Sequence, residues 1–473
     1  MSDLVAIVLA AGHGTRMKSS LPKVLHRACG RPLVYYPVQA ALELGADKVV
    51  IVVNSQTRAK IVEELSLHVP SDKFSVAVQE VPLGTGDAAR RGVETIELSK
   101  DDRVLILSGD VPLLEADDLR EVVTGLDSKR CCLKLMTFFA QDPRGYGRIL
   151  RDSGGAPREI REEKDLRSSD ERQITEVNAG VYAALAGDLR QALGALDSDN
   201  AQGEFYLTDI VPLLAKTGTV TTVKASEQSL AGVNDRAQLN EIEEILFARI
   251  RRRWGKLGVT IKGRPLIDES VHIEPEALIE DGVRLRGKTR IGAHTHVDVG
   301  TVIQDTEVGE RATIKPYCVL SESTVGANVQ LGPFAHLRPQ TVLQDDVHIG
   351  NFVETKKSLI KKGAKANHLA YLGDAEIGEK SNIGAGTIVC NYDGFLKSRT
   401  VVGAGVFIGS DSQLVAPLNI GAGAYVATGT TVTQDIPANA LAIGRVRQIN
   451  KEGYASRLRA RLQSAAQNKK SKT

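Results

Sequence analysis

The stretch VRLRGKTRIGAHTHVDVGTVI, residues 283–303, places an aliphatic residue at every sixth position, at Leu285, Ile291, Val297 and Ile303. A period of six puts one inward aliphatic residue on each short strand, and three such strands form one triangular coil of a parallel β-helix. An antiparallel sandwich is disfavoured because its strands alternate with a period of two. The stretch therefore predicts a solenoid of hexapeptide repeats.

The same period extends in both directions from this stretch. Aliphatic residues continue it from Ile273 to Ile349 and from Leu372 to Val432, with occasional steps of five. The register is disturbed between Ile349 and Leu372, and it is interrupted again after Val389, where CNYDGFLKSRT inserts seven extra residues. Insertions in solenoids map to loops on one face, which is often the binding face. These two segments are therefore candidate sites.

The first half of the chain has a different pattern, in which short apolar runs alternate with helical stretches. Buried strands are predicted at 5–10, 49–53, 104–108 and 133–139, and a crossover helix is predicted at 33–45. This order predicts a wound α/β sheet. We expect three parts, which are an α/β domain at 1–236, a linker helix at 237–257 with Asp235 as its N-cap, and the solenoid with a basic tail at 258–473. The tail from Ser456 is expected to be frayed or disordered.

The composition narrows the classes of partner. The 473 residues carry a formal charge of +2, which is too balanced for a protein whose main partner is nucleic acid or an anionic membrane. The five cysteines form no CxxC pair, and no run of about 18 apolar residues occurs. We therefore expect a cytoplasmic protein without stable membrane association.

A glycine-rich loop follows the first predicted strand, in LAAGHGTRMKSSLPKVLH, residues 9–26. Such a loop places backbone N–H groups at the carboxyl edge of a parallel sheet, where phosphates bind. The dinucleotide fingerprint fails because Met17 stands at the third glycine, and the Walker pattern is absent. Arg16 and Lys23 add cationic charge that suits a triphosphate with a pyrophosphate leaving group.

Asp110 follows another predicted strand, in LILSGDVPLL, and is expected at the same sheet edge. A carboxylate beside a phosphate loop is repelled by the ligand unless a cation joins the two, so a bound Mg²⁺ is implied. The alternative is a solvated aspartate in a turn before Val-Pro.

Seven motifs of the first half resemble those of sugar-1-phosphate nucleotidyltransferases. They are LAAG-x-GTRM with Pro22-Lys23, QEVPLGTGDA (79–88), SGDVP (108–112), GYGR (145–148), EVNAGVY (176–182), GEFYLTD (203–209) and GVNDR (232–236). Joined to a hexapeptide solenoid, they resemble the bacterial family of bifunctional N-acetylglucosamine-1-phosphate uridyltransferases and glucosamine-1-phosphate N-acetyltransferases, over about residues 5–454.

The resemblance implies a Rossmann-like nucleotidyltransferase domain, a left-handed parallel β-helix and a homotrimer. It also implies two reactions of UDP-N-acetylglucosamine biosynthesis. Glucosamine-1-phosphate is acetylated by acetyl-coenzyme A, and UMP then passes from UTP to N-acetylglucosamine-1-phosphate with release of pyrophosphate. UTP and acetyl-coenzyme A would be co-substrates, with Mg²⁺ as the metal.

The resemblance also assigns the residues of the nucleotide site. Arg16 and Lys23 would act on the phosphates, and Asp110 with Asn234 would hold Mg²⁺, while His13 receives no role. The residues implied to contact UTP or the UDP-sugar are Leu9, Ala10, Ala11, Gly12, Lys23, Gln79, Gly84, Thr85, Ser108, Gly109, Asp110, Gly145, Glu162, Asn178 and Asn234.

His368 is the candidate general base of the solenoid. A lone histidine is usually structural, but His368 lies in a disturbed repeat among basic and amide residues, and imidazole can deprotonate an attacking amine near neutral pH. The resemblance implies the same role. It further implies that glucosamine-1-phosphate is bound by Arg338, Lys356, Tyr371, Asn382 and Lys397. The coenzyme would contact Ala385, Asn391, Tyr392, Ser410, Thr428 and Arg445, and Thr428 departs from the alanine typical of that position.

Two other interpretations remain. A nucleotidyltransferase with one site could use its solenoid only for assembly, but His368, Lys356 and Tyr371 argue against this. A scaffolding protein without catalysis is disfavoured by Lys23, Asp110 and Asn234.

Overall fold

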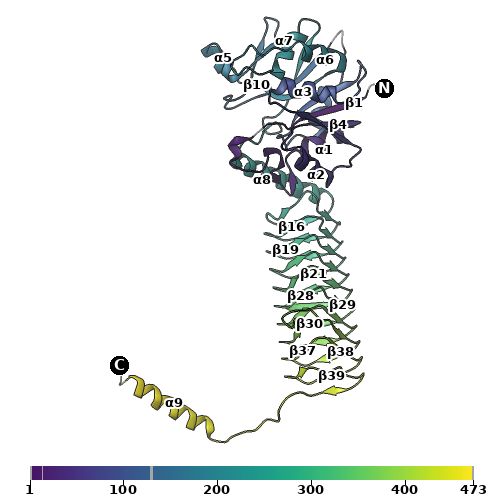
Figure 1. Cartoon of the computed structure of the whole chain (residues 1–473), viewed down its shortest axis with the longest axis vertical. Coiled ribbons are helices and arrows are strands. Elements are labelled where there is room, and N and C mark those ends of the chain that lie inside the picture. Colours follow the sequence, from purple (N-terminus) through teal and green to yellow (C-terminus); the bar gives the residue numbers. More distant parts are fainter. Residues whose placement is uncertain (1–2, 13, 128–130, 471–473) are drawn as a thin grey trace. The chain divides into compact units, whose positions relative to one another are not determined.

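The computed structural model describes residues 3–12, 14–127 and 131–470, and the chain divides into two compact units (Figure 1). The first unit extends to Lys256 and also includes Leu266–Val271. The second consists of Leu257–Pro265 and the chain from His272 onward. The helix that follows the α/β domain thus belongs to the first unit.

The first unit is built on a mixed sheet in the order β11-β7-β10-β6-β1-β4-β5. Its strands are β1 (Leu4–Leu9), β4 (Lys48–Asn54), β5 (Phe74–Gln79), β6 (Arg103–Ser108), β7 (Leu133–Phe139), β10 (Glu176–Leu185) and β11 (Val220–Lys224). β1, β4, β5 and β6 are parallel, whereas β10 is antiparallel to both β6 and β7. β8 (Arg148–Arg151) and β9 (Pro157–Arg161) extend from β10, and β2 (Arg27–Ala28) pairs with β3 (Arg31–Pro32). The four predicted strands are confirmed as β1, β4, β6 and β7.

Helices cover both faces of this sheet. Successive residues of a strand point to opposite faces, and in the buried strands both sets of residues are apolar and must be covered. In β1, Ala6 and Val8 belong to one apolar cluster, and Val5 and Ile7 belong to the other. The first cluster packs against α1 (Tyr35–Leu44), α2 (Arg58–Ser66) and α4 (Ala116–Val123). The second packs against α3 (Thr85–Glu94), α6 (Ala186–Gly194) and α7 (Ile210–Leu214). The short α5 is Ser169–Gln173.

The end of the first predicted helix and the start of the second agree with their sequence signals. α1 ends at Gly45, whose φ of 99° is left-handed, and the Gly45 N–H caps the last turn. α8 (Arg236–Lys256) begins after Asp235, whose carboxylate accepts from the Gln238 N–H at 2.9 Å. The predicted crossover helix and the predicted N-cap are therefore confirmed.

The second unit is a parallel β-helix that extends from β12 (Thr260–Ile261) to β41 (Leu441–Ala442) and is visible as stacked coils in Figure 1. From β12 to β37, each strand pairs in parallel with the third strand further along the chain, as β15 (Leu278–Ile279), β18 (His296–Val297) and β21 (Thr313–Ile314) do. Three strands therefore complete one coil. The residues of the predicted period are all buried, and their exposure does not exceed 4%. The hexapeptide prediction is confirmed, and the hand of the coil stays a prediction.

The disturbed register between Ile349 and Leu372 proves to be a change of residue type rather than an insertion. Thr355, Ile360 and Ala366 occupy the inward positions there, with exposures of 0%, 1% and 1%. The interpretation of this segment as a break in the solenoid was wrong. The coils continue through it, but threonine and alanine at the inward positions do not continue the pattern of large aliphatic residues.

The segment after Val389 is a true insertion. It forms a loop between β34 (Ile388–Cys390) and β35 (Thr400–Val402), and Phe395 at its tip is 91% exposed.

The C-terminal tail was predicted to be frayed or disordered, but it forms α9 (Tyr454–Lys470). Its Ala, Leu, Arg and Gln residues are strong helix formers, and this local propensity outweighs its polar composition. Among the described residues, no helix has both the length and the apolar character needed to cross a bilayer.

Candidate functional site

A cavity of about 350 Å³ opens at the carboxyl end of β1, where the glycine-rich loop begins. Open parallel sheets bind ligands at this edge. Ten predicted residues line the cavity, namely Leu9, Ala10, Ala11, Gly12, Lys23, Gln79, Gly84, Thr85, Ser108 and Asp110. His13 lies outside the described residues. The structure therefore gathers most of the predicted nucleotide contacts from three separate motifs.

Two glycines shape this cavity by allowing close approach. Gly14 has a φ of 58°, and a Cβ there would lie 2.4 Å from the Lys23 Cβ. Gly84 has a φ of 107°, and a Cβ there would lie 2.5 Å from the Phe205 carbonyl oxygen. Neither position can carry a side chain without displacing its neighbour, so both glycines fix where the loop and the cavity wall lie.

The two predicted metal ligands are held close together, and each contacts a cation of the loop. Lys23 Nζ forms an ion pair with Asp110 Oδ2, and Arg16 Nη2 donates to Asn234 Oδ1 at 2.8 Å. The Val233 N–H donates to the Asp110 carbonyl at 2.9 Å, which brings the Asn234 segment to the end of β6. The structure therefore brings two oxygen-bearing side chains and two cationic side chains together at this edge of the sheet.

These oxygen donors fit Mg²⁺. The carboxylate of Asp110 also accepts from Ser108 Oγ at 2.6 Å, and the amide oxygen of Asn234 faces Arg16. The described residues contain no group of three or more His, Cys, Asp or Glu that could hold a metal ion. A site with few protein ligands suits Mg²⁺, which keeps several waters and takes further oxygens from substrate phosphates.

The side-chain amide of Gln79 is held in place by hydrogen bonds within the protein. Its Nε2 donates to the Gly84 carbonyl at 3.0 Å and to Asp87 Oδ2 at 2.9 Å, and its side chain is buried. A pre-oriented buried amide can discriminate between bases by hydrogen bonding, because a mismatched base would leave it unpaired.

The predicted sugar contacts Gly145, Glu162 and Asn178 are not among the residues that line the cavity. Asn178 lies where the register of β10 shifts, and its N–H donates to the Gly147 carbonyl at 2.9 Å. Glu162 accepts from Thr208 Oγ1 at 3.2 Å, and burial raises its pKa. The pKa of Tyr146, next to Gly145, is raised by burial and also by the negative charges of Glu227 and Asp110.

Among the other predicted residues of this site, Gly109 does not line the cavity, although its N–H donates to the Leu9 carbonyl at 2.9 Å. Four lining residues were missed, and they are Val24, Pro82, Ala88 and Glu204. All four could have been proposed from the sequence, because each lies within or next to one of the motifs that carry the family resemblance.

Asp209, which ends the GEFYLTD motif, gives a pH-dependent prediction. Burial and the negative charges of Asp197, Glu159 and Asp165 raise its pKa to about 6. The folded state therefore holds this proton more tightly than the unfolded state, and the protein loses stability as the pH rises from about 4 to 6. We expect Asp209→Asn to raise the free energy of unfolding at pH 7 by about 1 kcal/mol, since partial exposure screens the effect.

Urea unfolding at several pH values between 4 and 7 measures this gain, which should shrink as the pH falls. Asp199→Asn is the control because Asp199 is an exposed neighbour. A variant that is no more stable than the parent at pH 7 would contradict the prediction.

In the solenoid, four predicted residues form one line along the coils. His368, Ala385, Ser410 and Thr428 each lie two residues after the inward residue of their coil. Backbone bonds link successive coils along this line, as from the Gly429 N–H to the Ser410 carbonyl at 2.9 Å. We call the set Asn351, His368, Ala385, Ser410 and Thr428 the corner row. The structure therefore places the predicted base next to the predicted coenzyme contacts.

Three cations gather on the neighbouring strand face. Arg338 follows β25 (His336–Leu337) at the level of Lys356 in β28 (Glu354–Lys356), and Arg338 donates to Glu354 Oε1 at 2.7 Å. The positive charge of Lys397, followed by that of Arg338, lowers the pKa of Lys356. Such mutual repulsion among exposed cations is relieved by a bound anion, so the cluster suits a phosphate group.

Tyr371 lies beside this cluster. It begins β31 (Tyr371–Gly373), and a Cβ at Gly373 would lie only 2.4 Å from the Tyr371 hydroxyl oxygen. The glycine therefore leaves the space that the phenol occupies. Asn382 begins β33 (Asn382–Ile383) on the face that contains β30 (Lys365–His368).

The remaining coenzyme candidates hold the loop and the end of the solenoid. Asn391 Nδ2 donates to Asp374 Oδ2 at 2.6 Å, and the Tyr392 hydroxyl donates to the Gly394 carbonyl at 2.5 Å. Arg445 Nη1 donates to the Thr428 carbonyl at 2.9 Å. Arg445 thus reaches the corner row, while Asn391 and Tyr392 brace the loop that carries Lys397.

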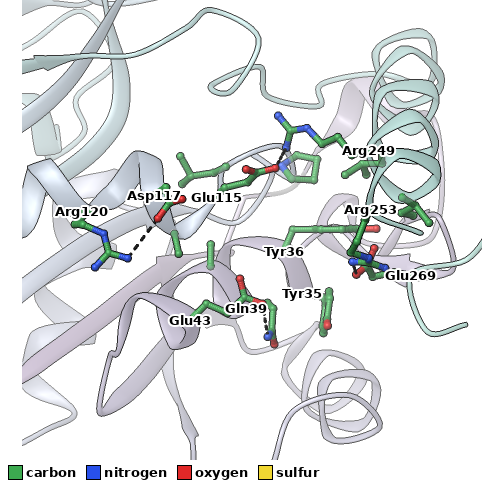
Figure 2. Close-up of a pocket in the computed structure, with 16 residues that line it drawn as sticks. Tyr35, Tyr36, Gln39, Glu43, Glu115, Asp117, Arg120, Arg249, Arg253 and Glu269 are labelled. Atoms are coloured by element: carbon green, nitrogen blue, oxygen red, sulfur yellow. Dashed lines mark hydrogen bonds and ion pairs between the residues drawn. The ribbon is translucent and has the colours of Figure 1, made fainter. Parts of the chain in front are cut away.

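A further cavity of about 490 Å³ lies between α1, α4 and α8, and it contains none of the predicted residues (Figure 2). Its charged side chains are paired within the wall, as in the bonds from Arg249 Nη1 to Glu115 Oε1 at 2.9 Å and from Arg253 Nη1 to Glu269 Oε1 at 2.6 Å. Its chemistry does not match a phosphate site.

Comparison with known proteins relates both halves to known families. The model of a MobA-like NTP transferase domain matches residues 6–206, and the model of the GMPPB C-terminal domain matches residues 261–353. The Bifunctional protein GlmU of Sorangium cellulosum is 55% identical over 468 residues, which is 98% of both chains. That of Anaeromyxobacter dehalogenans is 50% identical over 98% of this chain and 94% of its own length, and that of Pelobacter propionicus is 45% identical over 97% and 99%. The chain therefore belongs to the family of bifunctional GlmU proteins.

Proposed function

We propose that the cavity at β1 transfers UMP and that the corner row of the solenoid transfers acetyl, so that the acetylated product of the second unit becomes the substrate of the first. As a member of this family, the chain is a bifunctional enzyme with uridyltransferase and acetyltransferase activities. The single observation that supports the assignment of sites is the gathering of phosphate-binding cations at both places, each beside the expected reactive group.

In uridylyl transfer, a phosphate oxygen of N-acetylglucosamine-1-phosphate attacks the α-phosphorus of UTP. The new P–O bond forms as the bond to the β-phosphate breaks, and pyrophosphate leaves. Lys23 and Arg16 offset the charge that grows on the leaving group, while Gln79 orients the base. The protein needs no nucleophile of its own, because positioning and charge stabilisation supply the catalysis.

Asp110 and Asn234 would hold Mg²⁺ for this reaction. The metal supplies Lewis-acid stabilisation of the phosphate charge when it is bound. Asp110 and Asn234 each contact a loop cation, so we propose that Lys23 and Arg16 turn from these oxygens to the phosphates when the nucleotide enters.

In acetyl transfer, the amine nitrogen of glucosamine-1-phosphate attacks the thioester carbonyl carbon of acetyl-coenzyme A. His368 accepts the amine proton, the tetrahedral intermediate collapses with cleavage of the C–S bond, and the thiolate takes up the proton as it leaves. Arg338, Lys356 and Lys397 bind the sugar phosphate, Tyr371 and Asn382 orient the sugar, and the corner row beyond His368 binds the coenzyme.

We further propose that the enzyme is a homotrimer in the cytoplasm. The exposed tip of the inserted loop supports assembly, because Phe395 and Leu396 are 91% and 71% exposed and would bury apolar surface against a second copy. Sedimentation equilibrium measures the mass of the assembly.

One incubation tests the function as a whole. The full chain is supplied with glucosamine-1-phosphate, acetyl-coenzyme A, UTP and Mg²⁺, and free thiol and pyrophosphate are followed separately. We expect thiol release first and pyrophosphate release only when the acetylated sugar phosphate has formed. Pyrophosphate release at full rate without acetyl-coenzyme A would overturn the proposed order.

A further inference from the structure

Asn351 is the residue of the corner row that precedes His368, in the adjacent coil. β27 (His348–Asn351) pairs in parallel with β30, and Asn351 stands directly opposite His368 in this register. Asn351 Oδ1 lies 2.9 Å from His368 Nδ1. The Asn351 carbonyl also accepts from the N–H of Leu369, the next residue after His368, at 3.0 Å. Asn351 thus holds both the imidazole ring and the backbone that carries it.

Gly350 makes this approach possible. A Cβ at this position would lie 1.9 Å from the Asn367 carbonyl oxygen of the adjacent coil, and no side chain fits in that space. The glycine therefore lets the two coils pack closely enough for Asn351 to reach the imidazole.

The contact determines which ring nitrogen carries the proton. An amide oxygen is only an acceptor, so a hydrogen bond to Asn351 Oδ1 requires an N–H at His368 Nδ1. In neutral imidazole the other nitrogen, Nε2, then holds the lone pair. We infer that Asn351 is a positioning residue that keeps His368 in the tautomer whose Nε2 accepts the proton of the attacking amine. This inference rests on the proposed role of His368.

The choice of an amide over a carboxylate has a chemical consequence. A carboxylate at the same place would stabilise the charged imidazolium, so less neutral base would be present near neutral pH. An amide orients the ring without adding charge. The charged and titratable groups around this corner are His348 on β27, Lys365 on β30 and Lys315 after β21, together with Glu354 and Tyr371, which are register partners on the adjacent face.

Two variants test the inference in the full chain. Asn351→Ala should lower kcat of acetyl transfer about 10-fold to 100-fold, with KM for glucosamine-1-phosphate changed less than about twofold, because the base is misoriented while the phosphate contacts remain. Asn351→Asp still accepts from Nδ1, so it should keep a rate near that of the parent at alkaline pH. Its pH profile should fall off at a pH about one unit higher on the acid side.

The controls separate this inference from the proposed function. Uridylyl transfer by the same variants reports that the first unit is folded, and an unchanged KM for glucosamine-1-phosphate reports that the solenoid is folded. Asn419→Ala changes an exposed asparagine on β38 (Leu418–Ile420) and should leave both activities unchanged. If His368→Ala keeps acetyl transfer, the proposed role of His368 as the base fails, and the positioning role of Asn351 fails with it. If His368→Ala loses it but both Asn351 variants keep the parent's kcat and pH profile, only the positioning role is overturned.

Discussion

His368→Ala should reduce acetyl transfer about 100-fold to 10,000-fold and leave uridylyl transfer unchanged, since general-base catalysis by a positioned imidazole contributes about this factor. Alanine removes the group that we propose accepts the amine proton, while the cations proposed to bind the sugar phosphate lie elsewhere, after β25, in β28 and on the inserted loop. The loss should therefore appear in kcat rather than in KM. Thiol release from acetyl-coenzyme A and pyrophosphate release from UTP measure the two activities in the same preparation.

His296→Ala is the matched control for this variant. His296 also lies on an outward face of the solenoid, where its Nε2 is 3.5 Å from Glu280 Oε1, and it has no place in the proposed site. We expect both activities to survive in this control. Acetyl transfer that persists at the parent's rate in His368→Ala would remove His368 from the mechanism.

The solenoid could be predicted closely from the sequence because its repeat depends only on residues that are close together in the chain. One inward residue per strand is enough to define the coil, and residues such as Leu285 and Ile291 follow that rule without exception. The prediction was wrong where the inward residue is polar or small, as at Thr355 and Ala366. Thr355 is tolerated inside because its hydroxyl lies 3.0 Å from that of Thr341, so the buried polar atom is satisfied. Such compensation depends on a neighbouring coil and leaves no periodic signal.

The candidate sites could be predicted in part for the same reason. Loop residues that follow strands, such as Lys23 and Asp110, are expected together at one sheet edge, and the structure brings them into an ion pair. The partner of His368 could not be predicted, because Asn351 is seventeen positions away and becomes its neighbour only through the number of residues in the intervening coil. The helix of the tail was missed because composition outweighed local propensity in the prediction.

Asp110→Asn should lower kcat/KM of uridylyl transfer by about 100-fold or more, which corresponds to several kcal/mol of lost stabilisation of the phosphate charge. The amide retains an oxygen that can accept from Ser108 Oγ, so the local geometry is preserved while the charge is lost. Acetyl transfer should be unaffected. Calorimetric titration of Mg²⁺ in the presence of UTP should show weaker binding, which gives a readout that does not depend on turnover.

The ion pair between Lys23 and Asp110 leads to a second expected result for this variant, because the substitution removes the carboxylate that pairs with Lys23. Nucleotide binding without Mg²⁺ should be retained or strengthened in Asp110→Asn, since the freed ammonium group is available to the phosphates and one negative charge is gone. A merely damaged site would lose both nucleotide and metal. Asp117→Asn is the control, as this carboxylate on α4 is 92% exposed and lies outside the nucleotide cavity. Unchanged Mg²⁺-dependent release of pyrophosphate in Asp110→Asn would exclude Asp110 as a ligand of the metal.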